Sequence, residues 1–122
     1  MADAPNEAPV ESIHSASASA HISHAVIATY AAAAALEVDG VHAVAGGRAG
    51  GIDPDRVPKG VRISSDGDGL SVELHLVTEW GAAIPRVAGM VDRHVREYLG
   101  SMIDLEPASV AIVIDDVVQP ER

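Results

Sequence analysis

Residues 70–95, LSVELHLVTEWGAAIPRVAGMVDRHV, decide the fold because their hydrophobic periodicity changes from that of a strand to that of a helix. Apolar residues alternate with polar ones at the start, which predicts a strand over 70–80 that is covered on one face only. The chain then bends at Gly81 and enters a helix through Ile84 and Pro85. A proline in the first helical turn lacks only an N–H that has no helical partner there.

The helix that follows Pro85 has an apolar stripe at helical spacing. Arg86, Arg93 and Arg96 are expected to lie in water, and a nucleic-acid-binding face is the alternative. The acidic net charge and the lack of aromatic residues that stack on bases argue against that alternative. The residues expected to be buried are Val87, Val91, Val95 or His94, Tyr98 and Met102.

A second stretch, residues 25–44 (AVIATYAAAAALEVDGVHAV), predicts another helix. Ser23 is placed to cap its first turn. The alanine run has high helix propensity and forms a flat packing face. Gly40 is expected to supply the left-handed residue that ends the helix at Asp39-Gly40. The expected apolar stripe is Val26, Ile27, Tyr30, Ala34 and Val38.

Two more strands complete the predicted fold. Residues 60–64 and the strand over 70–80 form a hairpin around the turn 66–69, and residues 108–116 form the last strand. Its core candidates are Val110, Ile112 and Ile114, while Ala111 and Val113 leave its opposite face apolar as well. The order α-β-β-α-β predicts a two-layer α/β sandwich with two helices on one face of a three-stranded mixed sheet.

The chain is expected to hold one domain, over residues 21–118. Residues 1–20 are rich in Ala, Ser, Pro and Glu, so they are expected to be a disordered tail, although the alternation in SASASAH (15–21) leaves a short strand open. Residues 119–122 are a C-terminal tail. The glycine-rich segment 46–58 predicts a flexible loop.

The composition excludes several classes of function. Eight basic and eighteen acidic residues give a net charge of −10, which repels nucleic acid and anionic lipid and favours a basic partner. The chain has no cysteine, so thiolate metal sites and cysteine nucleophiles are excluded. Its N-terminus lacks the features of a secretory signal. The uncharged stretch 25–36 spans about 18 Å, less than the roughly 30 Å of a bilayer core, so direct membrane insertion is not expected.

Three short motifs have a structural and a functional interpretation. His21 and His24, with His14 nearby, have spacing for a metal site but lack a fixed third ligand, so a structural or solvated role is favoured. The turn 66–69 (DGDG) is a hairpin turn rather than a calcium loop, because a strand begins immediately. The segment 46–51 lacks the Lys-Ser or Lys-Thr of a phosphate loop. Neither a metal nor a cofactor is therefore predicted.

No set of catalytic residues is apparent, and the chain is predicted not to be an enzyme. Glu73 and His75 share the exposed face of their strand, and His75 would make that face responsive to pH if an interface buried it. Trp80 has two interpretations: it anchors the hairpin to the second helix, or it is an exposed interface residue. The interface residues predicted are Glu73, His75, Val77, Trp80, Ala111 and Val113.

Four segments together resemble the alkaline shock protein family, also called the envelope stress response family, of Gram-positive bacteria. They are VIATYAAAAALEVDGVHAV (26–44), KGVRI (59–63) followed by LSVELHLVTEWG (70–81), IPRVAGMVDRHVREYLGSMIDLE (84–106) and SVAIVIDDV (109–117). The resemblance implies an abundant cytoplasmic protein without known catalysis that self-associates and reaches the inner face of the membrane through a small integral membrane anchor protein. Ala83 departs from the family, in which a polar residue often caps the second helix.

The leading hypothesis is therefore a cytoplasmic, non-catalytic scaffold or adaptor in envelope stress homeostasis, which forms a homo-oligomer and binds a membrane-anchored partner. The alternative is a module that binds a small ligand or RNA, since small α/β sandwiches often do so. That alternative predicts a concave site between the second helix and the glycine-rich loop, with Arg48, Arg56 and Lys59.

Overall fold

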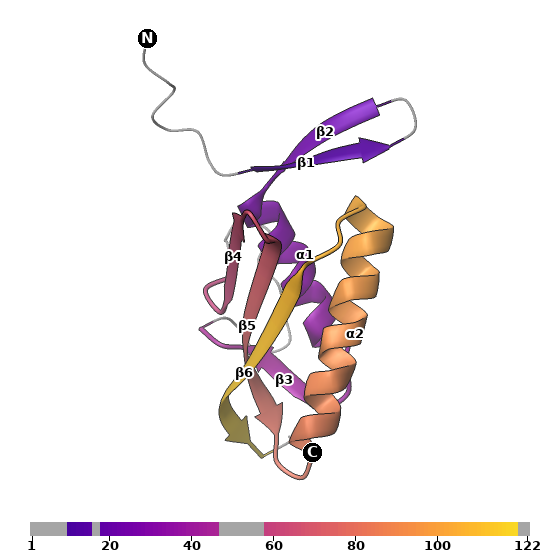
Figure 1. Ribbon diagram of the computed structural model, residues 1–122. Coiled ribbons are helices and arrows are strands. Elements are labelled where there is room, and N and C mark those ends of the chain that lie inside the picture. Colours follow the sequence, from indigo (N-terminus) through magenta and orange to yellow (C-terminus); the bar gives the residue numbers. More distant parts are fainter. Residues whose placement is uncertain (1–9, 16–17, 47–57, 120–122) are drawn as a thin grey trace.

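The computed structural model describes residues 10–15, 18–46 and 58–119 (Figure 1). In chain order the elements are β1 (Val10–Ser15), β2 (Ala18–Ser23), α1 (His24–Leu36), β3 (Val41–Val44), β4 (Val61–Asp66), β5 (Gly69–Glu79), α2 (Ile84–Ile103) and β6 (Ser109–Val118). The predicted α/β class, the two helices and the mixed sheet are confirmed. The predicted number and order of strands are wrong, since one sheet has four strands and β1 and β2 form a second sheet.

Strand β5 is the centre of the larger sheet because it pairs along both of its edges. β6 runs parallel to it over residues 71–79. β4 is antiparallel to it over residues 69–74, and β3 over residues 76–78. Since β6 occupies one edge along this whole length, β3 and β4 follow one another along the other edge. The short strand β3 lies in the segment 25–44, which was predicted as a helix and its end, and it is the strand of this sheet that was not predicted.

The junction of β3 and β4 explains why residue 60 is a glycine. The carbonyl oxygen of His75 accepts a hydrogen bond from the N–H of Ala45, and the N–H of His75 donates to the carbonyl oxygen of Gly60. A Cβ atom on Gly60 would lie 2.5 Å from the carbonyl oxygen of Ala45 and 2.8 Å from Cγ1 of Val44. The two strands therefore meet on β5 only because residue 60 has no side chain.

Helix α1 is buried on more than one side. Ser23 caps it as predicted, its Oγ accepting from the N–H of Val26 at 3.2 Å. The helix ends at Leu36, earlier than predicted, and Gly40, with a φ of +97°, closes the turn after it. Val26 is exposed and Tyr30 half-buried, contrary to the predicted stripe. The residues buried instead are Ile27, Ala28, Ala31, Ala32, Ala34 and Ala35, with Val38 after the helix. Alanines on several sides allow both α2 and the sheet to approach closely.

Helix α2 packs a stripe with a spacing of four residues on the sheet. Pro85 lies in its first turn as predicted, and Ala83 provides no side-chain cap. The predicted burial of Met102 is wrong, because Met102 is 53% exposed and Tyr98 is half-buried. The buried residues are Val87, Val91, Val95, Leu99 and Ile103. Together with α1 they cover the face of β5 that carries Val72, Leu74 and Leu76, so both helices share one core.

The N-terminal hairpin is a second correction. Residues 1–20 are predicted to be a disordered tail, with a short strand left open at 15–21. Val10–Ser15 and Ala18–Ser23 instead form antiparallel strands, and the second of them overlaps the strand that was left open. Nε2 of His24, the first residue of α1, lies 2.8 Å from Oε2 of Glu11 on β1. This contact ties the hairpin to the domain. Residues 1–9 and 120–122, and most of the predicted glycine-rich loop (47–57), lie outside the described residues.

Candidate interaction surface

The face of the sheet opposite the helices is not covered by any described element, and we call it the open sheet face. The registers of β4 and β6 on β5 decide which side chains lie on it, because paired residues share a face. Glu73 of β5 lies between Arg62 and Ala111, and His75 lies beside Val113. The residues of the open sheet face are Arg62, Ser64, Ser71, Glu73, His75, Val77, Ser109, Ala111, Val113 and Asp115.

His75 connects two carboxylates across this face. Its Nε2 lies 2.6 Å from Oε2 of Glu73 on the same strand, and its Nδ1 lies 3.1 Å from Oδ1 of Asp115 on β6. Asp115 reaches His75 because the β5–β6 register shifts between Leu76 and Val77, which leaves Asp115 unpaired in the ladder. The shift is a β-bulge, which redirects a side chain in this way.

The two carboxylates raise the pKa of His75 above 6.5; the hydrogen bond to Glu73 is the larger cause and that to Asp115 the next, while desolvation opposes both. The charges on neighbouring strands matter as well. Arg62 lies directly across from Glu73 on β4, and the described part of β6 adds only acidic charge beside His75. The protonation of His75 thus sets the charge of the middle of the open sheet face.

This cluster does not have the geometry of a metal or hydrolytic site. Each ring nitrogen of His75 is turned to a different carboxylate, so the three groups do not converge on one point. Among the described residues, no group of three or more His, Asp or Glu side chains is placed to hold a metal ion. His75 is 28% exposed, and its carboxylate partners are more than 40% exposed. All three side chains of the cluster are therefore partly open to solvent.

Apolar side chains lie beside the charged ones on the same face. Val113 is 38% exposed, Ala111 is exposed and Val77 is half-buried. Nearby, Oγ of Ser109 donates to Oγ of Ser71 at 3.0 Å. A shallow hollow of about 570 Å³ lies over this end of the face, between Arg62, Ser64 and Ala111. Five of the six residues predicted as an interface are therefore neighbours on one surface.

Trp80 is the exception. It follows the last residue of β5, and its side chain is 69% exposed. Its interpretation as a core anchor is therefore wrong. The alternation along β5 also puts it on the opposite side from Glu73, His75 and Val77. Trp80 belongs to one end of the domain rather than to the open sheet face.

The other candidates are dispersed. His21 contacts Ser12 within the hairpin, and His24 contacts Glu11. The turn between β4 and β5 is a two-residue hairpin turn as predicted, in which Oδ1 of Asp66 accepts from the N–H of Asp68 at 2.8 Å. Lys59 is exposed. Arg48 and Arg56, needed for the predicted ligand site, lie outside the described residues.

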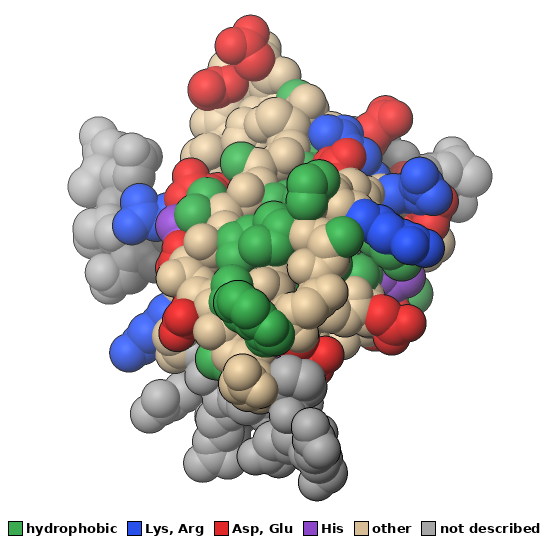
Figure 2. All heavy atoms as spheres, turned by 90° about the horizontal axis from the view of Figure 1, so that it is seen from below, with side chains coloured by type: hydrophobic (Ala, Val, Ile, Leu, Met, Phe, Trp, Pro, Cys, Tyr) green, Lys and Arg blue, Asp and Glu red, His purple; other side chains and the backbone are tan. Residues whose placement is uncertain are grey.

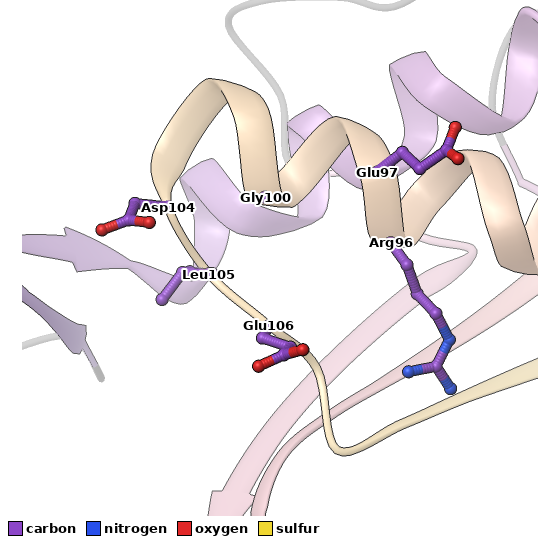
Figure 3. A pocket seen from close by; sticks show the side chains of 6 residues that line it. All are labelled: Arg96, Glu97, Gly100, Asp104, Leu105 and Glu106. Carbon is purple, nitrogen blue, oxygen red and sulfur yellow. The ribbon is translucent and has the colours of Figure 1, made fainter.

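The hollow at the end of α2 is acidic (Figure 3). It measures about 440 Å³, and its charged lining residues are Glu97, Asp104 and Glu106 together with one basic residue, Arg96. That guanidinium is already engaged, since its Nε donates to Asp92 at 2.9 Å and its Nη1 donates to the carbonyl oxygen of Pro107 at 3.1 Å. A site of this charge does not suit a phosphate or a nucleic acid.

Neither helix in the described part of the chain is long and apolar enough to cross a membrane. The fold and its surfaces define a small α/β domain whose prominent feature is an uncovered sheet face. No solved structure matches the chain.

A model of the alkaline shock protein family, whose description gives a "cell envelope-related function", matches residues 12–119, and the chain belongs to this family. The chain is also 33% identical over 93 residues to the uncharacterized protein YqhY of Bacillus subtilis strain 168. That match covers 73% of this chain and 69% of YqhY. A relation to the cell envelope is thus a property of the family.

Asp115 is the site residue that the sequence analysis missed. The alternation of the last strand pointed to Ala111 and Val113, and it continues to Asp115. Its contact with His75, however, depends on the parallel register and on the bulge, neither of which has a sequence signal. The paired aspartates at 115 and 116, in an otherwise apolar strand, were the available hint.

Proposed function

We propose that this chain is a non-catalytic adaptor in cell-envelope homeostasis, which works on the cytoplasmic side, associates with itself and binds a membrane-anchored partner. The observation that carries the proposal is the open sheet face. It is an ordered surface with an apolar strip, and no described element covers it. Exposed apolar side chains that gather on one ordered face often mark a surface that binds another chain.

The charges of the open sheet face favour a second copy of the chain as its occupant. A two-fold interface brings the same patch together from both copies, so the patch must be complementary to itself. This face carries Arg62 and, when protonated, His75, together with Glu73 and Asp115. A cation of one copy can therefore meet an anion of the other, despite a net charge of −10 on the whole chain.

The family supports the link to the envelope. Its model covers residues 12–119, which is nearly all of the described chain. In this proposal a membrane-anchored protein, rather than lipid, holds the chain at the envelope, since the net charge of −10 disfavours contact with anionic lipid. The hollow at the end of α2 does not favour the alternative of an RNA- or ligand-binding module, because three of its six lining residues are acidic and one is basic.

The partner-binding half of the proposal is tested by fractionating cells that make the protein. We expect the wild-type chain to sediment with membranes through a protein contact. Protease treatment of the membrane surface should therefore release it, and protein-free vesicles of the extracted lipids should not bind it. Quantitative crosslinking should recover one integral membrane protein in a constant ratio. A chain that stays in the soluble fraction, with no crosslinked membrane protein, would contradict the adaptor role.

A further inference from the structure

Three exposed apolar residues meet at the end of the domain where β5 and β6 finish and α2 begins (Figure 1). Trp80 is 69% exposed, and Ile84 and Val117 are each 37% exposed. We call them the Trp80 end surface. The N–H of Trp80 donates to the carbonyl oxygen of Val118 at 2.6 Å, which joins two of the three elements. Viewed from this end, hydrophobic side chains gather in the middle of the surface (Figure 2).

The Trp80 end surface is separate from the open sheet face. Val117 pairs with Thr78, whose side chain lies fully buried under the helices. Val117 therefore belongs to the helix side of the sheet, as does Trp80 by strand alternation. The residues that define the two surfaces lie on opposite sides of β5. Each surface can therefore bind a different partner.

The backbone around Trp80 is held in place. The N–H of Ala82 donates to the carbonyl oxygen of Glu79 at 3.1 Å, and the N–H of Val87 donates to that of Ala83 at 2.9 Å. Gly81, which lies between Trp80 and Ala82, makes the turn with a φ of +96°. A large side chain on an ordered turn loses little conformational entropy on binding, and tryptophan is enriched among residues that dominate binding energy.

The charges next to this surface are mostly negative. Glu79 precedes Trp80 and Asp116 precedes Val117, at the rim between this surface and the open sheet face, since Glu79 alternates with Trp80 and Asp116 pairs with Val77. Asp39 is adjacent to Gly40, whose carbonyl oxygen accepts from the N–H of Glu79. Arg86 is the basic residue in the first turn of α2. The ion pairs found among the described residues include none of these three acids.

We propose that the Trp80 end surface docks a peptide segment of another protein, one with an apolar anchor residue flanked by lysine or arginine. Two copies of this surface would instead bring their acids together, which disfavours self-association here. The inference names the chemistry of the partner that the adaptor function requires and rests on that function. It does not rest on self-association through the open sheet face.

The test uses synthetic peptides of leucine and lysine as the probe. Trp80 is the only tryptophan of the chain, so its fluorescence reports directly on its surroundings. We expect the leucine–lysine peptide to bind saturably and to shift the emission of Trp80 to shorter wavelength. A peptide with glutamate in place of lysine should not bind, and one with serine in place of leucine should bind at least about tenfold more weakly.

Variants locate the binding site, with a labelled peptide and fluorescence anisotropy as the readout. Trp80→Ala should weaken binding about tenfold or more, and Glu79→Gln with Asp116→Asn should weaken it and reduce its salt dependence. Met102→Ala is the matched control, because Met102 is an exposed apolar residue in the last turn of α2. It should leave the affinity unchanged. Circular dichroism melts verify that each variant is folded.

Two results would overturn the inference. One is the absence of saturable binding, and the other is an equal effect of Trp80→Ala and Met102→Ala, which indicates attraction by net charge alone. A Val113→Glu variant separates the two surfaces, since it should leave peptide binding unchanged. If the peptide does not bind although membrane recruitment persists in cells, the adaptor function stands and the partner chemistry proposed for this surface is wrong.

Discussion

His75 lies between two carboxylates, and its protonation controls the charge balance of the open sheet face. Glu73 and Asp115 on its two ring nitrogens favour the imidazolium form. A histidine whose pKa is raised in the folded state stabilises that state fully below its ordinary pKa. The stabilisation is lost as the pH rises through the raised pKa. The loss therefore occurs above pH 6.5, on the alkaline side.

The first prediction concerns this titration. We expect the imidazole resonances of His75 to report a pKa above 6.5 in the wild-type chain, measured by NMR as a function of pH. Glu73→Gln removes the larger cause and should lower the pKa of His75 toward 6.5. Ser64→Ala, on the same face but without a described hydrogen bond to His75, is the control. An identical pKa in the wild type and in Glu73→Gln would disprove the role of this contact.

Gly60 is the residue on which the β3–β4 junction depends. Its Cβ position is already occupied by backbone atoms of Ala45 and His75, which are not free to rotate away. We expect Gly60→Ala to lower the free energy of unfolding by about 1–3 kcal/mol, measured by urea denaturation. Gly67→Ala in the β4–β5 turn has no atom within 4 Å of the new Cβ and is the control. Equal stability losses in both variants would show that the junction is not the cause.

At the scale of elements, one carboxylate of the N-terminal hairpin contacts the rest of the domain, in addition to the packing of Ile22 against the core. The hydrogen bond from His24 is the larger cause that lowers the pKa of Glu11 below 4.5, and that from Ser65 on β4 is the next. Glu11 therefore connects β1 both to the start of α1 and to the larger sheet. A carboxyl group whose pKa is lowered stabilises the folded state above its ordinary pKa.

We predict that the hairpin detaches on acidification before the domain unfolds. As the pH falls below 4.5 and through the lowered pKa of Glu11, its contacts are lost. Hydrogen exchange at matched pH should show faster exchange in β1 and β2 than in β5, and Glu11→Gln should produce the same pattern near neutral pH. Glu97→Gln, on the exposed side of α2, is the control. Uniform protection across all strands would contradict this attachment.

The parts of the fold that were predictable from sequence are those with a local periodic signal. The alternation at 70–80 and the helical stripe after Pro85 identified β5 and α2, with errors only at the end of the stripe. The strand β3 has four residues, and the hairpin strands are rich in serine and alanine, so neither has a strong pattern. β3 forms because it pairs with β5, which is distant in the sequence. β1 and β2 pair with each other, and each has a low intrinsic preference for a strand.

The candidate surface, like the fold, was predictable only where a local periodic pattern identifies it. Strand alternation is enough to put Glu73, His75 and Val77 on one face and to add Ala111 and Val113 from the last strand. The contact of Asp115 with His75 was not predictable, because it needs the register of a parallel pair and a bulge. The exposure of Trp80 was not predictable either, since it depends on where α2 begins relative to the end of β5.

For the whole molecule, the central claim is that two copies associate through the open sheet face. The most direct test is sedimentation of the full chain over a range of concentrations, with Val113→Glu as the disrupting variant. Val26→Glu is the matched control, because Val26 is 42% exposed on α1, on the opposite side of the sheet.

We expect the wild type and Val26→Glu to associate reversibly in the micromolar range. Val113→Glu should raise the dissociation constant by about tenfold or more, because the interface would bury an added carboxylate. A wild-type chain that remains a monomer at high micromolar concentration, with Val113→Glu behaving identically, would contradict the account.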